Sequence, residues 1–129
     1  MNGRSYPLVA HLVHKNAERK LAVVAVLLSE RKANRFIADV WKHLPAEEGK
    51  EIAPADVSVD ATGLLPPQRG YFTFTGSLTT PPCTEGVTWF VLKSPVQISK
   101  DQVAAFAKKY PHNARPVQPL NGRSVQATR

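Results

Sequence analysis

Two strand-like segments joined by a rigid loop set the strongest limit on what this chain can fold into. Residues 71–75 alternate aromatic side chains with threonines, which is the period-2 pattern of a strand with one buried face. Residues 87–92 are β-branched and aromatic, which favours a second strand. The loop between them contains two adjacent prolines, which fix φ and remove two backbone donors. The sequence therefore predicts two strands whose loop holds Thr79 and Thr80 at its mouth.

The rest of the chain predicts two more long strands and two helices. Residues 6–14 alternate like a strand, and residues 21–28 are apolar on both faces and rich in β-branched side chains, so the two form an antiparallel hairpin. A helix is predicted from Asn34, its N-cap, to about Leu44. A second helix is predicted from a capping box at Ser99 to about residue 110.

Shorter elements are expected in the remaining segments. We expect a short strand around Val57 and Val59, and a tight turn at residues 64–66 that buries two leucines. Residues 95–98 are expected to form a strand entry, and residues 113–123 an extended, proline-punctuated tail. The predicted fold class is mainly β (α+β), with an antiparallel sheet and two peripheral helices.

Length and composition exclude some classes of function and partner. One domain is the natural interpretation of 129 residues, and such a chain can bury a core. The net charge of +7 comes from dispersed basic residues, whereas a nucleic-acid footprint is usually clustered, so a nucleic-acid partner is not expected. The longest apolar run, residues 21–28, is too short to span a bilayer, and no leader peptide is visible. The single cysteine, Cys83, excludes an intrachain disulfide.

The loop sequence Gly-Ser-Leu-Thr-Thr-Pro-Pro at residues 76–82, followed by Thr88 and Trp89, resembles the α-class carbonic anhydrases. The tail Gln-Pro-Leu-Asn-Gly-Arg at residues 118–123 resembles the end of the same domain. The resemblance covers nearly the whole chain but only about the C-terminal half of the family's domain. It implies that residues 1–129 are a single truncated carbonic-anhydrase-like domain with a partial sheet. The absent N-terminal half would carry two zinc ligands as a His-x-His pair.

By this resemblance, His11 aligns with the family's third zinc ligand. Thr79 aligns with the catalytic threonine, which orients zinc-bound hydroxide and donates to a glutamate in the absent half. The implied substrate-binding residues are Val13, Val23, Leu78, Thr80, Val87 and Trp89. From the sequence alone, a lone strand histidine is more often structural and these apolar positions are simply core. Arg115 resembles a structural arginine near the family's site, and a buried ion pair is its expected role.

The ligand set expected from the sequence is incomplete. A catalytic zinc site needs three protein ligands and a water. His14 lies three residues beyond His11, so on a strand it points to the opposite face. Val9 stands where many family members have a glutamate that accepts a hydrogen bond from the ligand's second ring nitrogen, and this weakens the site further.

The resemblance implies a lyase that reversibly hydrates carbon dioxide to bicarbonate with zinc as cofactor, impaired or inactive as an isolated chain. The alternative is a non-catalytic, self-associating fragment or binding module. Besides carbon dioxide and bicarbonate, two partners are expected. One is a second copy of the chain, in a homo-oligomer that forms through an exposed sheet edge and that the free Cys83 could reinforce. The other is a complementing N-terminal half. Neither a nucleic acid nor a membrane is expected. The cellular compartment is left undecided by the sequence. The expected compartment is the cytoplasm if these residues are the whole gene product, whereas intact bacterial relatives are periplasmic.

Overall fold

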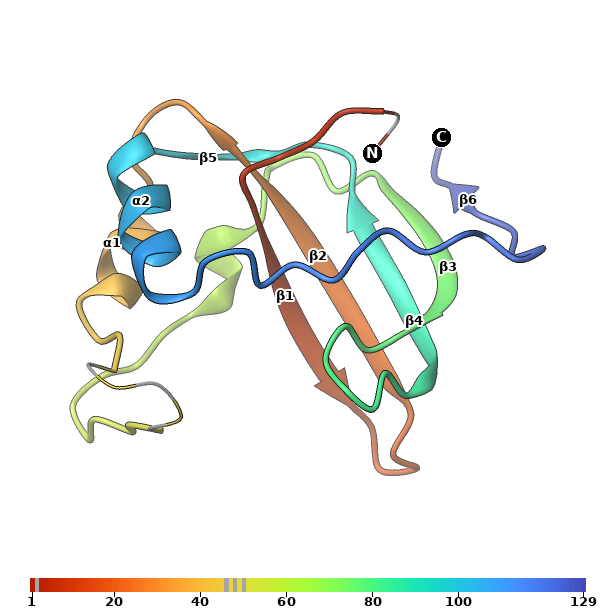
Figure 1. Ribbon diagram of the computed structural model, residues 1–129, viewed down its shortest axis with the longest axis horizontal. Coiled ribbons are helices and arrows are strands. Elements are labelled where there is room, and N and C mark those ends of the chain that lie inside the picture. The colour runs from red at the N-terminus through yellow and green to blue at the C-terminus, as the bar shows by residue number, and fades with distance from the viewer. Residues whose placement is uncertain (2, 46, 48, 50) are drawn as a thin grey trace.

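A computed structural model describes residues 1, 3–45, 47, 49 and 51–129 of the chain. Its centre is a six-stranded sheet in the order β1-β2-β4-β3-β6, with β5 paired to β2 (Figure 1). The strands are β1 (Leu8–Lys15), β2 (Leu21–Glu30), β3 (Tyr71–Ser77), β4 (Glu85–Leu92), β5 (Val96–Ile98) and β6 (Gln126–Ala127). The helices are α1 (Arg35–Trp41), the 3-10 helix η1 (Ala61–Leu64) and α2 (Lys100–Lys109). The predicted mainly β fold with two helices is confirmed.

Strands β1 and β2 form the predicted antiparallel hairpin, with His11 opposite Ala25. Asn16 closes the turn, because its side-chain oxygen accepts a hydrogen bond from the Lys20 amide at 2.8 Å. Within the described chain β1 pairs with β2 alone, so its second edge is free. A free edge presents unpaired backbone donors and acceptors to any strand that can reach it.

The sheet is mixed, whereas the sequence predicted an antiparallel one. Strand β2 pairs in parallel with β4, with Val23 beside Trp89, and in parallel with β5, with Leu28 beside Val96. The long connection after β2, which contains α1 and η1, leads into β3, which runs opposite to β2, and the β3–β4 hairpin then places β4 between β3 and β2, parallel to β2. The apolar character of β2 on both faces agrees with a strand buried between two layers.

Both helices and η1 pack against one face of the sheet. The even-numbered residues Val26 and Leu28 of β2 join a buried cluster with Ile37 of α1 and Leu64 of η1. Helix α1 begins where predicted, because the Asn34 side chain accepts from the Ile37 amide at 3.1 Å. Figure 1 shows α1 and α2 side by side at one end of the sheet, and the Trp41 indole joins them by donating to the Gln102 carbonyl at 2.9 Å.

Three short elements differ from the sequence expectations. No strand forms at Val57 and Val59; Val59 is 54% exposed, and the segment has no partner strand. The predicted turn near Leu64 begins earlier, as η1, capped by the Asp60 side chain. Strand β6 was not predicted, because two exposed residues carry no hydrophobic pattern; it pairs with β3, with Ala127 opposite Phe72. No helix in the described residues has the length and apolar character needed to cross a membrane.

Candidate functional site

The second face of the sheet carries the candidate site. Odd-numbered residues of β2 point here, and Val23 and Ala25 form a buried cluster with Val87 and Trp89 of β4. The chain after α2 runs across this face as an extended segment on its way to β6 (Figure 1). Within the described chain the helices occupy the other face, so the tail and the loop between β3 and β4 cover the cluster.

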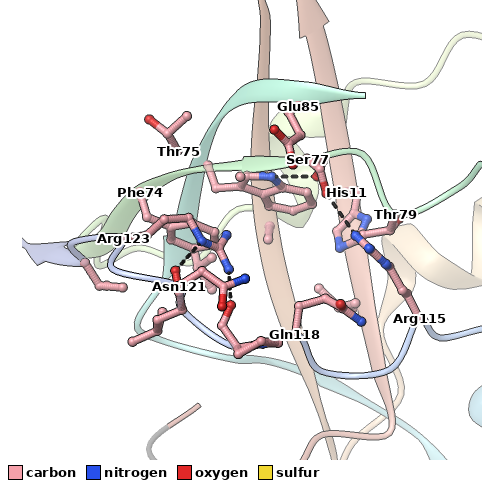
Figure 2. Close-up of a pocket in the computed structure, with 18 of the residues that line it drawn as sticks. His11, Phe74, Thr75, Ser77, Thr79, Glu85, Arg115, Gln118, Asn121 and Arg123 are labelled. Carbon is pink, nitrogen blue, oxygen red and sulfur yellow. Dashed lines mark hydrogen bonds between the residues drawn. The ribbon is translucent and has the colours of Figure 1, made fainter. Parts of the chain in front are cut away.

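A pocket of about 740 Å³ lies between the sheet and the tail. The sheet contributes side chains from β1, β2, β3 and β4, and the tail closes the opposite wall (Figure 2). The tail residues in the lining are Arg115, Pro116, Gln118, Pro119, Leu120, Asn121, Arg123 and Val125. Apart from Arg115, which the resemblance placed near the site, sequence reasoning did not assign these tail residues to a pocket, since extended polar segments give no periodicity that shows what they cover.

His11 lies in the pocket wall, on the edge strand. Its imidazole meets the Trp89 indole edge to face, with ring centroids 4.9 Å apart and an interplanar angle of 81°. The residue as a whole is exposed, yet partial burial of the ring lowers the pKa of His11 below its ordinary value of 6.5. The indole covers one side of the imidazole, while the other side remains open. A neutral imidazole is the form that binds a metal ion.

Ser77 connects the floor of the pocket to its wall. Its carbonyl oxygen accepts a hydrogen bond from Trp89 Nε1 at 3.0 Å. Its hydroxyl accepts a second bond from the Arg115 guanidinium at 2.9 Å (Figure 2). Arg115 is exposed, so the expected buried ion pair is wrong for the described chain. Sequence reasoning quoted Ser77 only as part of the loop at residues 76–82, because its contact with Arg115 joins residues 38 positions apart.

The loop between β3 and β4 brings Thr79 to the pocket. The Leu78 amide donates to the Thr84 carbonyl at 2.9 Å, and this bond closes the loop at its base. Thr79 is exposed and lines the pocket beside His11 and Arg115 (Figure 2). Thr80 is exposed and outside the lining.

Gly76 permits the close approach on which this arrangement depends. A Cβ atom there would lie 3.1 Å from Phe74 Cε2 and 3.1 Å from Trp89 Cδ1. Both atoms belong to stiff aromatic rings, so a larger residue would push the indole away from its place below the loop.

The predicted apolar wall is only partly gathered at the pocket. Trp89 lines it and is 6% exposed. Val23 and Val87 are buried in the same cluster beneath the floor, and Leu78 packs against that cluster. Val13 is on the same face, two residues beyond His11, but is 58% exposed and outside the lining.

The residues described here do not by themselves fit a zinc ion. No group of three His, Cys, Asp or Glu side chains in the described ranges could hold a metal. His14 lies on the opposite face from His11, as predicted, and its Nδ1 is 2.9 Å from the Leu12 carbonyl oxygen. Val9 lines the pocket beside His11 but offers no polar atom. The structure therefore provides one nitrogen donor next to a polar loop and an apolar floor.

Comparisons with known proteins agree with this geometry. A family model for the eukaryotic-type carbonic anhydrases matches residues 1–129. A carbonic anhydrase of Klebsiella pneumoniae is 45% identical over 97% of this chain and 51% of its own length. One from Nostoc sp. is 41% identical over 97% of this chain and 47% of its own length. The α-carbonic anhydrase of Thermovibrio ammonificans, solved with sulfanilamide, superposes with a TM-score of 0.90 at 42% identity, covering 96% of this chain and 55% of that one. The chain spans about half the length of the curated relatives it matches.

Proposed function

This chain belongs to the eukaryotic-type carbonic anhydrase family, and from that premise we propose that it supplies one part of a zinc-dependent site for the reversible hydration of carbon dioxide. No three described side chains could together hold a metal, whereas a catalytic zinc needs three protein ligands. In this proposal a segment pairs with the free edge of β1 and brings the other two donors.

The observation that carries the proposal is the meeting of His11 and Thr79 at one pocket. They lie 68 positions apart (79 − 11), on a strand and on a loop, and both line the same space above Trp89. The proposed division of labour follows from chemistry. His11 holds the metal through a ring nitrogen, Thr79 offers a hydroxyl that can accept and donate hydrogen bonds, and the apolar floor receives a nonpolar substrate.

The proposed substrate residues have different places in this scheme. Trp89 forms the floor, Val23 and Val87 are buried beneath it, and Leu78 packs against them. Val13 and Thr80 lie outside the lining and stay predictions from the resemblance.

Reconstitution from two polypeptides tests the proposal. This chain is mixed with the part of the Klebsiella pneumoniae carbonic anhydrase that it does not match, and the complex is isolated and assayed for zinc and for carbon dioxide hydration. We expect zinc near one per complex and activity absent from either polypeptide alone. His11→Ala should remove the zinc, whereas Thr79→Val should keep it and lower the rate by about 10²-fold, because an orienting group is lost.

His14→Ala is the matched control, because His14 is on the same strand and faces away from the pocket. It should leave zinc content and rate unchanged. Failure of the two polypeptides to associate, or an active complex that tolerates His11→Ala, would contradict the proposal.

A second candidate function is that of a non-catalytic module that associates through the same edge. The single imidazole in the pocket favours it, because one donor cannot fix a catalytic metal. An associated complex without zinc would favour this candidate over the first.

A further inference from the structure

A second pocket lies at the opposite end of the β3–β4 hairpin from Thr79. Its volume is about 320 Å³, and its lining residues are Met1, Arg4, Tyr6, Phe72 and Lys93. Phe72 belongs to β3, and Lys93 directly follows β4. Figure 1 shows the chain before β1 running over this end of the sheet towards β6. The two pockets share no lining residue.

The ammonium group of Lys93 is held in place from two sides. Its Nζ lies over the Phe72 ring, 5.2 Å from the centroid, and donates a hydrogen bond to the Thr128 carbonyl. Thr128 is itself fixed, because its amide donates to the Tyr71 carbonyl at 3.0 Å and its hydroxyl accepts from the Tyr71 amide at 2.9 Å. An ammonium group has three donors, so two remain for a ligand within the described chain.

Gly70 permits this placement of Lys93. A Cβ atom at Gly70 would lie 3.3 Å from Thr128 Oγ1 and 3.5 Å from Lys93 Cδ. The Lys93 amide donates to the Gly70 carbonyl at 2.8 Å, which fixes the base of the side chain as well. The position of the ammonium group is therefore set by the ends of β3 and β4, whereas a typical surface lysine rotates freely.

Arg4 adds a second cation with unused donors. Its guanidinium carbon lies over the Tyr6 ring, 5.4 Å from the centroid. Within the described residues the guanidinium donates no hydrogen bond, and neither Arg4 nor Lys93 pairs with a carboxylate. No Asp or Glu is among the lining residues. Two cations with free donors and two aromatic rings therefore line one small pocket.

A carboxylate carried on an aromatic ring matches these walls. Its two oxygens can accept hydrogen bonds from a guanidinium and an ammonium group at once. Its ring can pack against Tyr6 and Phe72, because aromatic rings attract one another edge to face or in offset stacks. The volume is at the small end of the range for ligand pockets, about 300–1,000 Å³, and suits a molecule with a single ring.

We propose that this pocket binds small aromatic carboxylates, with Arg4 and Lys93 holding the carboxylate and Tyr6 and Phe72 holding the ring. Met1, the remaining lining residue, contributes no group to this binding. The inference goes beyond the proposed function, because it uses no metal and no residue of the pocket that contains His11.

The test is a titration of the isotopically labelled 129-residue chain with benzoate, followed through its amide resonances. We expect saturable shifts at residues 4–6, 71–73 and 93. Benzyl alcohol keeps the ring but lacks the charge, so it should bind at least about 10-fold more weakly. Inorganic phosphate offers charge without a ring and should also bind more weakly than benzoate. Added sodium chloride should weaken benzoate binding, because it screens the two cations.

Two variants test the cations one at a time. Arg4→Gln and Lys93→Met should each weaken benzoate binding by about 5-fold, since each removes one partly exposed charge. Arg4→Gln leaves the fold intact, because Arg4 is exposed and its guanidinium has no hydrogen bond to lose. Lys93→Met keeps an apolar stem beside Phe72, and circular dichroism checks that it folds. Lys108→Met is the matched control: it removes an exposed charge from α2 and should leave the affinity unchanged.

Three results would overturn the proposal. The first is a titration in which benzoate gives no saturable shift at these residues. The second is benzyl alcohol or phosphate binding as tightly as benzoate, because the cations and the rings would then not act together. The third is wild-type affinity in both Arg4→Gln and Lys93→Met. These titrations contain neither zinc nor a second polypeptide, so their failure leaves the proposed function untouched.

Discussion

The imidazole of His11 and the indole of Trp89 meet edge to face, 4.9 Å between centroids, although β2 lies between their strands. The two rings can meet across β2 because Ala25, the β2 residue that pairs with His11, is small and buried. His11, the one imidazole that lines the pocket among the described residues, is thus positioned by a residue of the pocket floor. Substitution of Trp89 should change the position and environment of the His11 ring.

Trp89→Phe should destabilise the fold by about 1–3 kcal/mol, because the Ser77 carbonyl loses its donor in a partly buried place. It should also shift the His11 ring-proton resonances, since the neighbouring ring changes. Trp41→Phe is the matched control: it removes a similar indole hydrogen bond, to the Gln102 carbonyl, on the opposite face. Urea denaturation should show comparable losses for both variants. An unchanged His11 resonance in Trp89→Phe would contradict the contact.

Gln102 joins the two helices through one side chain. Its Oε1 accepts from the amides of Asn34 at 2.9 Å and Ser99 at 3.1 Å, and its Nε2 donates to the Asn34 carbonyl at 2.7 Å. Gln102→Leu should cost about 2–4 kcal/mol, because three hydrogen bonds at two helix starts are lost.

Gln102→Glu gives the graded comparison for the same position. Glutamate keeps the acceptor for the two amides but places a second oxygen against the Asn34 carbonyl. The loss of folding stability should therefore be smaller than for Gln102→Leu. Both values come from urea midpoints at neutral pH. Equal stability of wild type and Gln102→Leu would show that this junction does not stabilise the fold.

The sequence predicted the elements with strong local signals. The β1–β2 hairpin, the Asn34 cap and the Ser99 capping box all depend on residues within a few positions of one another, and each is confirmed. The parallel pairing of β2 with β4 was missed, because it depends on which strand of the β3–β4 hairpin lies next to β2 and not on the pattern of either strand.

The site was less predictable than the fold. The resemblance pointed to His11 and Thr79, and the structure places both at the pocket. The contact of Ser77 with Arg115 joins segments that share no pattern, and the extended tail gives no sign in sequence of what it covers. Val13 was grouped with the wall by resemblance, yet it is left exposed beside the free edge.

Asp60 should make stability depend on pH in acid. The hydroxyl and the amide of Thr62 both donate to its carboxylate, at 2.7 and 2.9 Å, and these bonds lower the pKa of Asp60 below its ordinary value of 3.8. The folded state therefore holds the carboxylate ionised more readily than the unfolded state does. This stabilisation is fully present above about pH 4 and is lost as the pH falls through the folded pKa.

The measurement for Asp60 is the urea midpoint of wild type and Asp60→Asn from about pH 7 to about pH 3. Asparagine can still cap η1 but does not titrate, so the advantage of wild type should shrink in acid. Thr62→Val should weaken the pH dependence, because the largest cause of the pKa shift is removed. Parallel pH profiles for wild type and Asp60→Asn would contradict the role of this carboxylate.

The hydrogen bond from Arg115 to Ser77 should hold the tail over the pocket without much effect on global stability. The hydrogen bond is exposed, so Ser77→Ala or Arg115→Ala should weaken the attachment of the tail by about 0.5–1.5 kcal/mol. Local opening of the tail should therefore increase by about 2–10-fold. Hydrogen exchange at residues 113–118 should report this increase while the urea midpoint barely moves. Arg123→Ala is the control, because Arg123 donates to the carbonyls of Pro119 and Leu120 in its own loop and should loosen that loop instead. Unchanged exchange at residues 113–118 in both Ser77→Ala and Arg115→Ala would mean that other contacts hold the tail in place.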